Sequence, residues 1–266
     1  MLDETQECVP LSGKKEEEPE QLTPPKQSAN TLFRFFRKRE YLLDALRTGA
    51  LIPRYYGENV DYLKIGHHQI SYPMICFCDI NIHRLSEHMS LYGKYGIAFS
   101  KSWGVHQGVQ PLQYINKHSI LRLDFTSAFA SAIADSEERP ANNYLLTQML
   151  FMKPIEGTMP RDDKDISKNF TDECEWRYVP NVKTIELPQV VCEGEVASIG
   201  VLNKTISEHE DCWLKYSYSD IKYIILQTDE EFEELCSLIE ALEVGADVKK
   251  KLLSKVIVWN DSKEDF

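Results

Sequence analysis

The stretch TLFRFFRKREYLLDALRTGALIPRYY, residues 31–56, decides the fold of this chain. Its first residues alternate between two faces, which predicts a short aromatic strand with Arg34 on one face. Apolar residues at helical spacing follow from Glu40. Gly49 suits the left-handed conformation of a helix C-cap, and Pro53 prevents the helix from continuing. The stretch therefore predicts a strand that carries one cation, then a helix, then a polar loop.

Residues 1–30 differ in composition from the rest of the chain. They hold four of the twelve prolines, the run KKEEEPE and almost no aromatic or β-branched residues. Such a segment buries too little apolar surface to offset the entropy lost on ordering, so we predict a disordered acidic tail. It contains no apolar run of signal-peptide length, and its acidity is not typical of a transit peptide, so we expect a cytoplasmic protein.

Residues 31–266 fit a single α+β domain, in which helices cover a central mixed or antiparallel sheet. Helical spacing over residues 119–152, interrupted at Arg139 and Pro140, predicts a helical insertion packed on that sheet. The charged, turn-rich residues 158–169 predict an exposed mobile loop. No run approaches the roughly 18 apolar residues that a membrane helix needs, so no membrane partner is expected.

The net charge of -12 is unevenly distributed along the chain. Residues 1–30, 31–130 and 131–266 carry balances of -4, +5 and -13. A basic first half can hold a phosphate-bearing ligand without making the whole protein a non-specific nucleic-acid binder. Chance drift of charge along a chain of this size accounts for the same counts, and the sequence leaves both interpretations open.

Cysteine and histidine spacing gives no convincing metal site. Cys76 and Cys78, followed by His83 and His88, form the nearest pattern, but its spacing differs from the paired cysteines of structural zinc sites. Small thiols are common in buried strands, so we expect core packing and no metal. Seven scattered cysteines are typical of a reduced intracellular protein.

The stretch FTDECEWRYVP, residues 170–180, is a candidate for chemistry. Glu175 stands at the start of a β-prone run, where a carboxylate can point into a cleft. Strand alternation places Glu175 and Arg177 on one face, so the two side chains can form an ion pair. An ordinary pair at an exposed strand edge, which contributes little to stability, is the alternative.

The stretch YGKYGIAFSKSWG, residues 92–104, places Tyr92 and Tyr95 beside two glycines. The rings can stack on a planar ligand while neighbouring lysines neutralise phosphate. A cross-strand aromatic cluster explains the same residues equally well.

Taken in order, these pieces resemble the AbiGi family of bacterial abortive-infection proteins. The resemblance covers nearly the whole chain after residue 30 and rests most on YGKYGIAF and EWRY. Members of that family are described as phage-defence proteins and as antitoxins of two-gene systems. The resemblance therefore implies an antiviral role and a partner protein, either the toxin of a toxin–antitoxin pair or a phage protein.

A more distant likeness connects the same pieces to ADP-ribosyltransferase-like folds. Their site motifs are a first-strand His or Arg, an aromatic-rich second motif and a Glu beside a late strand. The likeness implies an ADP-ribosyltransferase-like scaffold with NAD as a possible substrate. It implies catalytic roles for Arg34, Tyr92 and Glu175, and substrate-binding roles for Tyr95, Arg54 and Arg177. Breaking the bond from ribose to nicotinamide creates a cationic carbon, which a carboxylate stabilises, while an arginine can grip pyrophosphate.

Two functions follow from these resemblances. The first is an enzyme that ADP-ribosylates a target and halts growth, which requires Arg34, Glu175 and a tyrosine ring in one cleft. The second is a non-catalytic antitoxin or sensor that binds a partner protein, and the acidic second half suits a basic partner. A metal-dependent nuclease would need a ligand pattern that the scattered histidines do not supply.

Overall fold

The computed structural model describes residues 28–134, 139–161, 164–194 and 199–264, together with residues 23, 25 and 26. Most of the predicted tail, residues 1–30, lies outside the described residues. The described chain is a mixed α+β structure built around one large sheet.

The large sheet is mostly antiparallel. Its strands are β1 (Thr31–Phe36), β3 (Arg54–Asn59), β4 (Gln69–Cys78), β5 (Tyr95–Ser100), β6 (Gln110–Pro111), β11 (Glu175–Tyr178), β12 (Val191–Cys192), β14 (Ile221–Leu226) and β15 (Val256–Val258). They lie in the order β15-β14-β5-β1-β4-β11-β6, and β3 and β12 also pair with β4. The pair β14 and β15 is parallel, so the sheet is mixed, as predicted.

Helices and short strands surround this sheet. The α-helices are α1 (Arg39–Thr48), α2 (Leu85–Tyr92), α3 (Lys101–His106), α4 (Ile120–Ala134), α5 (Pro140–Leu150), α6 (Ile199–Glu208), α7 (Asp229–Ala241), α8 (Ala246–Leu253) and α9 (Trp259–Ser262). The remaining strands form two-stranded pairs: β2 (Ala50–Leu51) with β13 (Leu214–Lys215), β7 (Gln113–Ile115) with β8 (Met152–Pro154), and β9 (Glu156–Arg161) with β10 (Lys164–Asn169). Short 3-10 turns are η1 (Asp61–Leu63), η2 (Ile82–Arg84), η3 (Phe170–Glu173), η4 (Lys183–Ile185) and η6 (Glu210–Cys212).

The opening stretch forms the predicted strand and helix, but the predicted polar loop is wrong, because residues 54–59 form strand β3. Residues 31–36 form β1, and α1 ends at Gly49, whose φ of 62° is left-handed. The alternation within β1 divides its side chains between the two faces of the sheet. Leu32 packs into the core beneath α1, α7 and α8, whereas Phe33 packs on the other face beside α2 and α9. The predicted alternation of two faces is confirmed, and the structure shows that both faces of β1 are covered.

Strand β4 is the longest strand of the sheet and contains Pro73. A proline is uncommon inside a central strand, because it has no N–H to donate. Pro73 is level with Tyr55 of β3, and the Tyr55 N–H donates to Asn203 rather than to β4. The two residues are therefore not a hydrogen-bonded pair, so the ladder loses nothing through the missing N–H of proline.

The predicted mobile loop over residues 158–169 is also wrong. Residues 158–161 belong to β9 and residues 164–169 form β10, and the two strands pair antiparallel with Met159 level with Ile166. The Phe170 ring lies against Gly157, where a β-carbon would overlap it. Tertiary contacts thus order a segment whose composition is typical of a loop.

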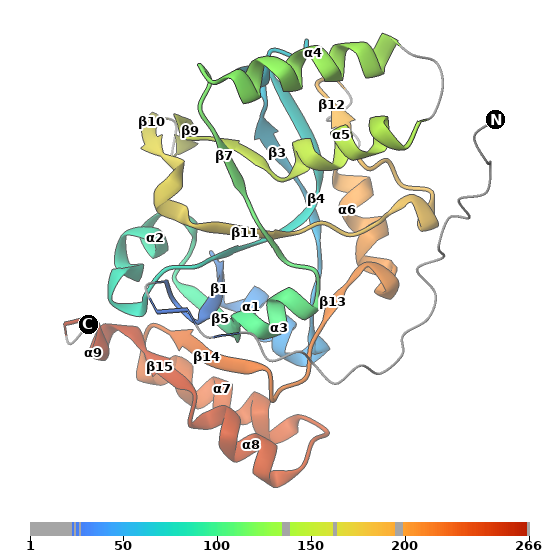
Figure 1. Ribbon diagram of the computed structural model, residues 1–266. Helices are drawn as coiled ribbons and strands as arrows, with labels where there is room; N and C mark the ends of the chain where they lie inside the picture. Colours follow the sequence, from blue (N-terminus) through green and yellow to red (C-terminus); the bar gives the residue numbers. More distant parts are fainter. Residues whose placement is uncertain are drawn as a thin grey trace.

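Two helices confirm the predicted helix pair in residues 119–152. Phe125 and Phe129 of α4 and Leu150 of α5 pack with Tyr72 and Met74 on the N-terminal half of β4. Figure 1 shows α4 and α5 at the opposite end of the molecule from α7 and α8. Within the described residues, no helix combines the length and the apolarity needed to cross a bilayer.

Candidate functional site

The candidate site is centred on β11, which pairs with β4. Glu175 is level with Cys78, and Arg177 is level with Cys76, so both side chains lie on the same face as these cysteines. Arg177 has no exposed surface, and Glu175 is 6% exposed. The alternative of an ion pair at an exposed strand edge is therefore wrong, while the pairing of the two residues is confirmed.

Arg177 uses every side of its guanidinium. Its Nε and Nη2 donate to Oε1 of Glu175 at 3.1 and 2.7 Å, and Nη2 also donates to Glu58 at 3.2 Å. Its Nη1 donates to the Tyr72 hydroxyl and, at 2.8 Å, to the Leu150 carbonyl. One side chain thus joins β11, β3, β4 and α5.

Lys153 of β8 bridges two carboxylates. Its Nζ donates to Oε2 of Glu173 and to Oε2 of Glu175, each at 2.7 Å. The intervening Cys174 is left-handed, with φ of 42°, an uncommon conformation for a residue other than glycine. This turn ends η3 and starts β11, so that two acids separated by one residue reach the same lysine.

Tyr92, at the end of α2, completes the cluster. Its hydroxyl donates to Oε1 of Glu173 and accepts from Nζ of Lys168 at 3.0 Å, and Lys168 pairs with Glu173 at 2.9 Å. The Lys168 ammonium lies 4.5 Å from the Tyr92 ring centroid. Tyr92 therefore contacts the Lys168–Glu173 ion pair through its hydroxyl and makes a cation–π contact with Lys168 through its ring.

These ion pairs form one group of balanced charge, which we call the buried charge cluster. It contains the cations Lys153, Lys168 and Arg177 and the acids Glu58, Glu173 and Glu175. Burial by itself would raise the pKa of Glu175, but Arg177 and then Lys153 outweigh it and hold this pKa well below its usual range. The Glu175 carboxylate is consequently ionised and held by two cations.

Arg34 is not part of this cluster. Phe33 and Glu175 are both level with Cys78 of β4, so they share a face, and Arg34 next to Phe33 belongs to the opposite face. Its guanidinium donates to the Cys76 carbonyl at 3.4 Å and lies 5.4 Å from the centre of the Phe36 ring. The structure therefore does not bring Arg34 and Glu175 into one cleft.

Two of the three predicted substrate-binding residues, Tyr95 and Arg54, also lie outside the buried charge cluster. The Tyr95 hydroxyl donates to Oε1 of Glu231 at 2.7 Å, which links β5 to the start of α7. Arg54 lies exposed on β3. Of the six residues predicted from the sequence, only Glu175, Tyr92 and Arg177 lie in or beside the buried charge cluster.

Sequence reasoning missed two of the three cations of the buried charge cluster, Lys153 and Lys168. Lys153 lies in FMKP between apolar residues, and Lys168 lies in the segment expected to be a loop. A lone lysine inside an apolar run is the one signal that would have identified Lys153, because a buried ammonium needs a carboxylate partner.

His88 and the strand cysteines behave as core residues. The His88 ring lies 4.5 Å from Tyr92 and 5.6 Å from Phe35, between ring centroids, and burial lowers its pKa to about 4. Cys78 is buried, and Cys76 and Cys78 are both free thiols. Among the residues that the structure describes, no group of three His, Cys, Asp or Glu side chains is placed to hold a metal.

Comparison with known proteins identifies the family. A family model described as "Putative abortive phage resistance protein AbiGi, antitoxin" matches residues 50–227. A protein named abortive phage resistance protein AbiGi from Lactococcus lactis subsp. cremoris is 35% identical over 248 residues, covering 82% of this chain and 100% of the relative. No solved structure gives a significant match. The chain therefore belongs to the AbiGi family of abortive phage resistance proteins.

Proposed function

We propose that this chain is the antitoxin of a two-gene abortive-infection system and that it acts in the cytoplasm by binding its partner toxin. The family description supports both the defence role and the antitoxin role. The toxin of such a pair is the partner that this proposal requires.

The main support for this proposal is that the Glu175 carboxylate is buried and fully hydrogen-bonded within the protein. A carboxylate that stabilises a reacting ribose must be open to its ligand. Both Glu175 oxygens accept hydrogen bonds from buried cations, and the residue is 6% exposed. The charges are thus satisfied within the protein, as in a structural polar core, which favours a binding role over chemistry at this position.

The ADP-ribosyltransferase-like scaffold and NAD as its substrate are the competing proposal. That enzyme would use Arg34 and Glu175 together, and the two residues lie on opposite faces of the sheet. No observation on the described residues favours NAD binding, so we place the binding role first.

Growth of bacteria separates the two proposals. The partner gene of the two-gene system is expressed from an inducible promoter, alone and together with this chain. We expect the partner alone to arrest growth and co-expression to restore it. A copy of this gene with an early stop codon serves as the control and leaves the arrest in place.

Purified protein incubated with NAD provides the second readout. We expect no release of nicotinamide above the level in buffer. Nicotinamide release that Glu175→Gln abolishes, together with growth arrest by this chain alone, would overturn the antitoxin proposal in favour of the enzyme.

A further inference from the structure

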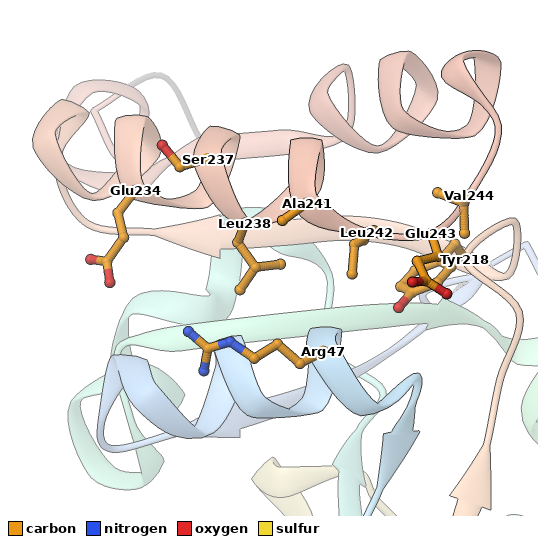
Figure 2. Close-up of a pocket in the computed structure, with 9 residues that line it drawn as sticks. All are labelled: Arg47, Tyr218, Glu234, Ser237, Leu238, Ala241, Leu242, Glu243 and Val244. Atoms are coloured by element: carbon orange, nitrogen blue, oxygen red, sulfur yellow. The ribbon is translucent and has the colours of Figure 1, made fainter.

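A groove of about 700 Å³ lies between α1 and α7, and no residue of the buried charge cluster lines it. It is lined by Arg47, Tyr218, Glu234, Ser237, Leu238, Ala241, Leu242, Glu243 and Val244. Figure 2 shows side chains of α7 pointing across the gap toward α1, from which Arg47 extends into the same space. Its volume is within the range of ligand sites, although the groove is open along one side.

The floor of the groove is apolar. Leu238 and Leu242 pack on the core beneath α7, and Ala241 lines the groove from an exposed position. A floor of small and branched side chains between two helices suits the apolar stripe of an amphipathic segment. The other lining residues, apart from Val244, are polar, namely Arg47, Tyr218, Glu234, Ser237 and Glu243.

The unpaired charge of the groove is negative. Arg47 already pairs with Asp44 at 2.7 Å, and Glu234 pairs with Arg39 at 2.9 Å. No ion pair engages Glu243 among the described residues. Helix α7 carries no basic residue and six acidic ones, namely Asp229, Glu230, Glu231, Glu233, Glu234 and Glu240. Of these six, only Glu234 lines the groove, and it is already paired. Within the described part of the chain, the rim therefore offers a ligand one unpaired acid, Glu243, beside a strongly acidic helix.

We propose that the groove binds a basic amphipathic segment of the toxin, which deepens the proposed function and rests on it. Apolar side chains of the segment cover Leu238 and Ala241, and a lysine or arginine beside them pairs with Glu243. A second copy of this chain is a poor occupant, because it brings the same acidic helix and a net charge of -12. The surplus of acids on α7 disfavours nucleic acid as an occupant.

Two substitutions test the groove, and a third is their control. Ala241→Arg fills the floor from an exposed position, and Glu243→Lys reverses the charge of the rim. Glu208→Lys makes the same charge change on α6, at an exposed position outside the groove. Circular dichroism and urea unfolding are used to verify that all three variants are folded.

Titration calorimetry with the purified toxin gives the main result. We expect Ala241→Arg and Glu243→Lys each to weaken binding at least tenfold and Glu208→Lys to change it less than twofold. If the toxin binds both groove variants as tightly as wild type, the groove is not the docking site, while the antitoxin proposal stands.

A peptide probe tests the groove independently of the toxin. The probe is a 16-residue helical peptide with leucines at three- and four-residue spacing and lysines beside them, and its partner carries glutamates in place of the lysines. We expect the basic peptide alone to protect amides of residues 237–244 from hydrogen exchange, and Ala241→Arg to abolish the protection. Equal protection in Ala241→Arg, or protection by the acidic peptide, contradicts the proposal.

If the toxin fails to bind the wild-type chain while the peptide result holds, the antitoxin proposal fails and the groove remains a basic-segment site. The two proposals are thus distinguished by separate measurements.

Discussion

Glu175 shows how one buried carboxylate can organise several chain segments. Removing its charge by Glu175→Gln leaves Lys153 and Arg177 buried with one acid fewer. Because an uncompensated buried charge is costly, we expect the free energy of unfolding to fall by about 3 kcal/mol. Urea unfolding monitored by circular dichroism measures this loss.

Glu208→Gln is the matched control for that substitution, since Glu208 is exposed. It should change the unfolding free energy by less than about 0.5 kcal/mol. A Glu175→Gln protein as stable as the control would show that the buried charge cluster contributes nothing to the fold.

His88 predicts a pH dependence of stability. Burial lowers its pKa from 6.5 to about 4, with Glu173 and Lys168 acting in opposite directions. Between these two values the unfolded chain binds a proton that the folded chain does not, so stability falls as pH decreases through this window. We expect a loss of about 2 kcal/mol between pH 7 and pH 5.

His88→Phe is the comparison for this effect, because it keeps ring contacts with Tyr92 and Phe35 and removes the titrating group. Its unfolding free energy should be nearly flat over the same window. If wild type and variant lose the same amount, another group is responsible for the pH dependence.

At the scale of single residues, the sequence predicted the pairing of Glu175 and Arg177 because strand alternation is a local property. It did not predict Lys153 or Lys168, which come from other segments of the chain. Which charge meets which across a sheet depends on strand order and register, and neither is encoded in a short motif.

At the scale of elements, the end of α2 depends on Gly93. Its φ of 144° is disfavoured for other residues, and a β-carbon there would overlap the Phe36 carbonyl at the end of β1. We expect Gly93→Ala to lower the unfolding free energy by more than about 2 kcal/mol, because strain and a backbone clash combine. Thermal unfolding measures the effect.

A substitution at Gly66 distinguishes backbone strain from the clash with the Phe36 carbonyl. It also has positive φ, at 89°, but a β-carbon there meets nothing within 4 Å. Gly66→Ala should therefore cost only about 1 kcal/mol, from backbone strain alone. Equal losses in the two variants would mean that the Phe36 carbonyl moves aside without cost.

Element prediction from the sequence succeeded where the signals were local. The C-cap at Gly49, which ends α1, was predicted because a glycine follows the last turn of apolar helical spacing. Strands β9 and β10 were not, because their polar composition is typical of a loop and their order comes from contacts with Tyr92 and Phe170.

At the scale of the whole molecule, the sheet and the β9–β10 pair should differ in local stability. Strand β5 lies between β1 and β14 and is buried on both faces, whereas β9 and β10 pair only with each other. We expect amides of residues 96–99 to exchange far more slowly than those of residues 165–168. Hydrogen exchange followed by mass spectrometry measures both.

Similar exchange rates in the two segments would contradict this expectation and indicate that the two sheets open together. Lys168→Met offers a further comparison, since it removes the ion pair between β10 and Glu173 of η3. Exchange in residues 165–168 should become faster in that variant.

The α+β class was predictable from the alternation of strand and helix patterns, whereas the position of Arg34 relative to Glu175 was not. Their separation follows from the register of β1 and β11 on the same strand, β4. A likeness in the order of motifs along a chain fixes neither register nor face.

The equal number of acids and cations in the buried charge cluster should constrain how these residues vary among related sequences. Loss of any one charged residue leaves a buried charge of opposite sign without its partner. A lineage that replaces one of the six residues should therefore also replace a second, oppositely charged one. Aligned relatives ought to show these six positions changing in compensated pairs, inherited as a block even where the surrounding surface has drifted.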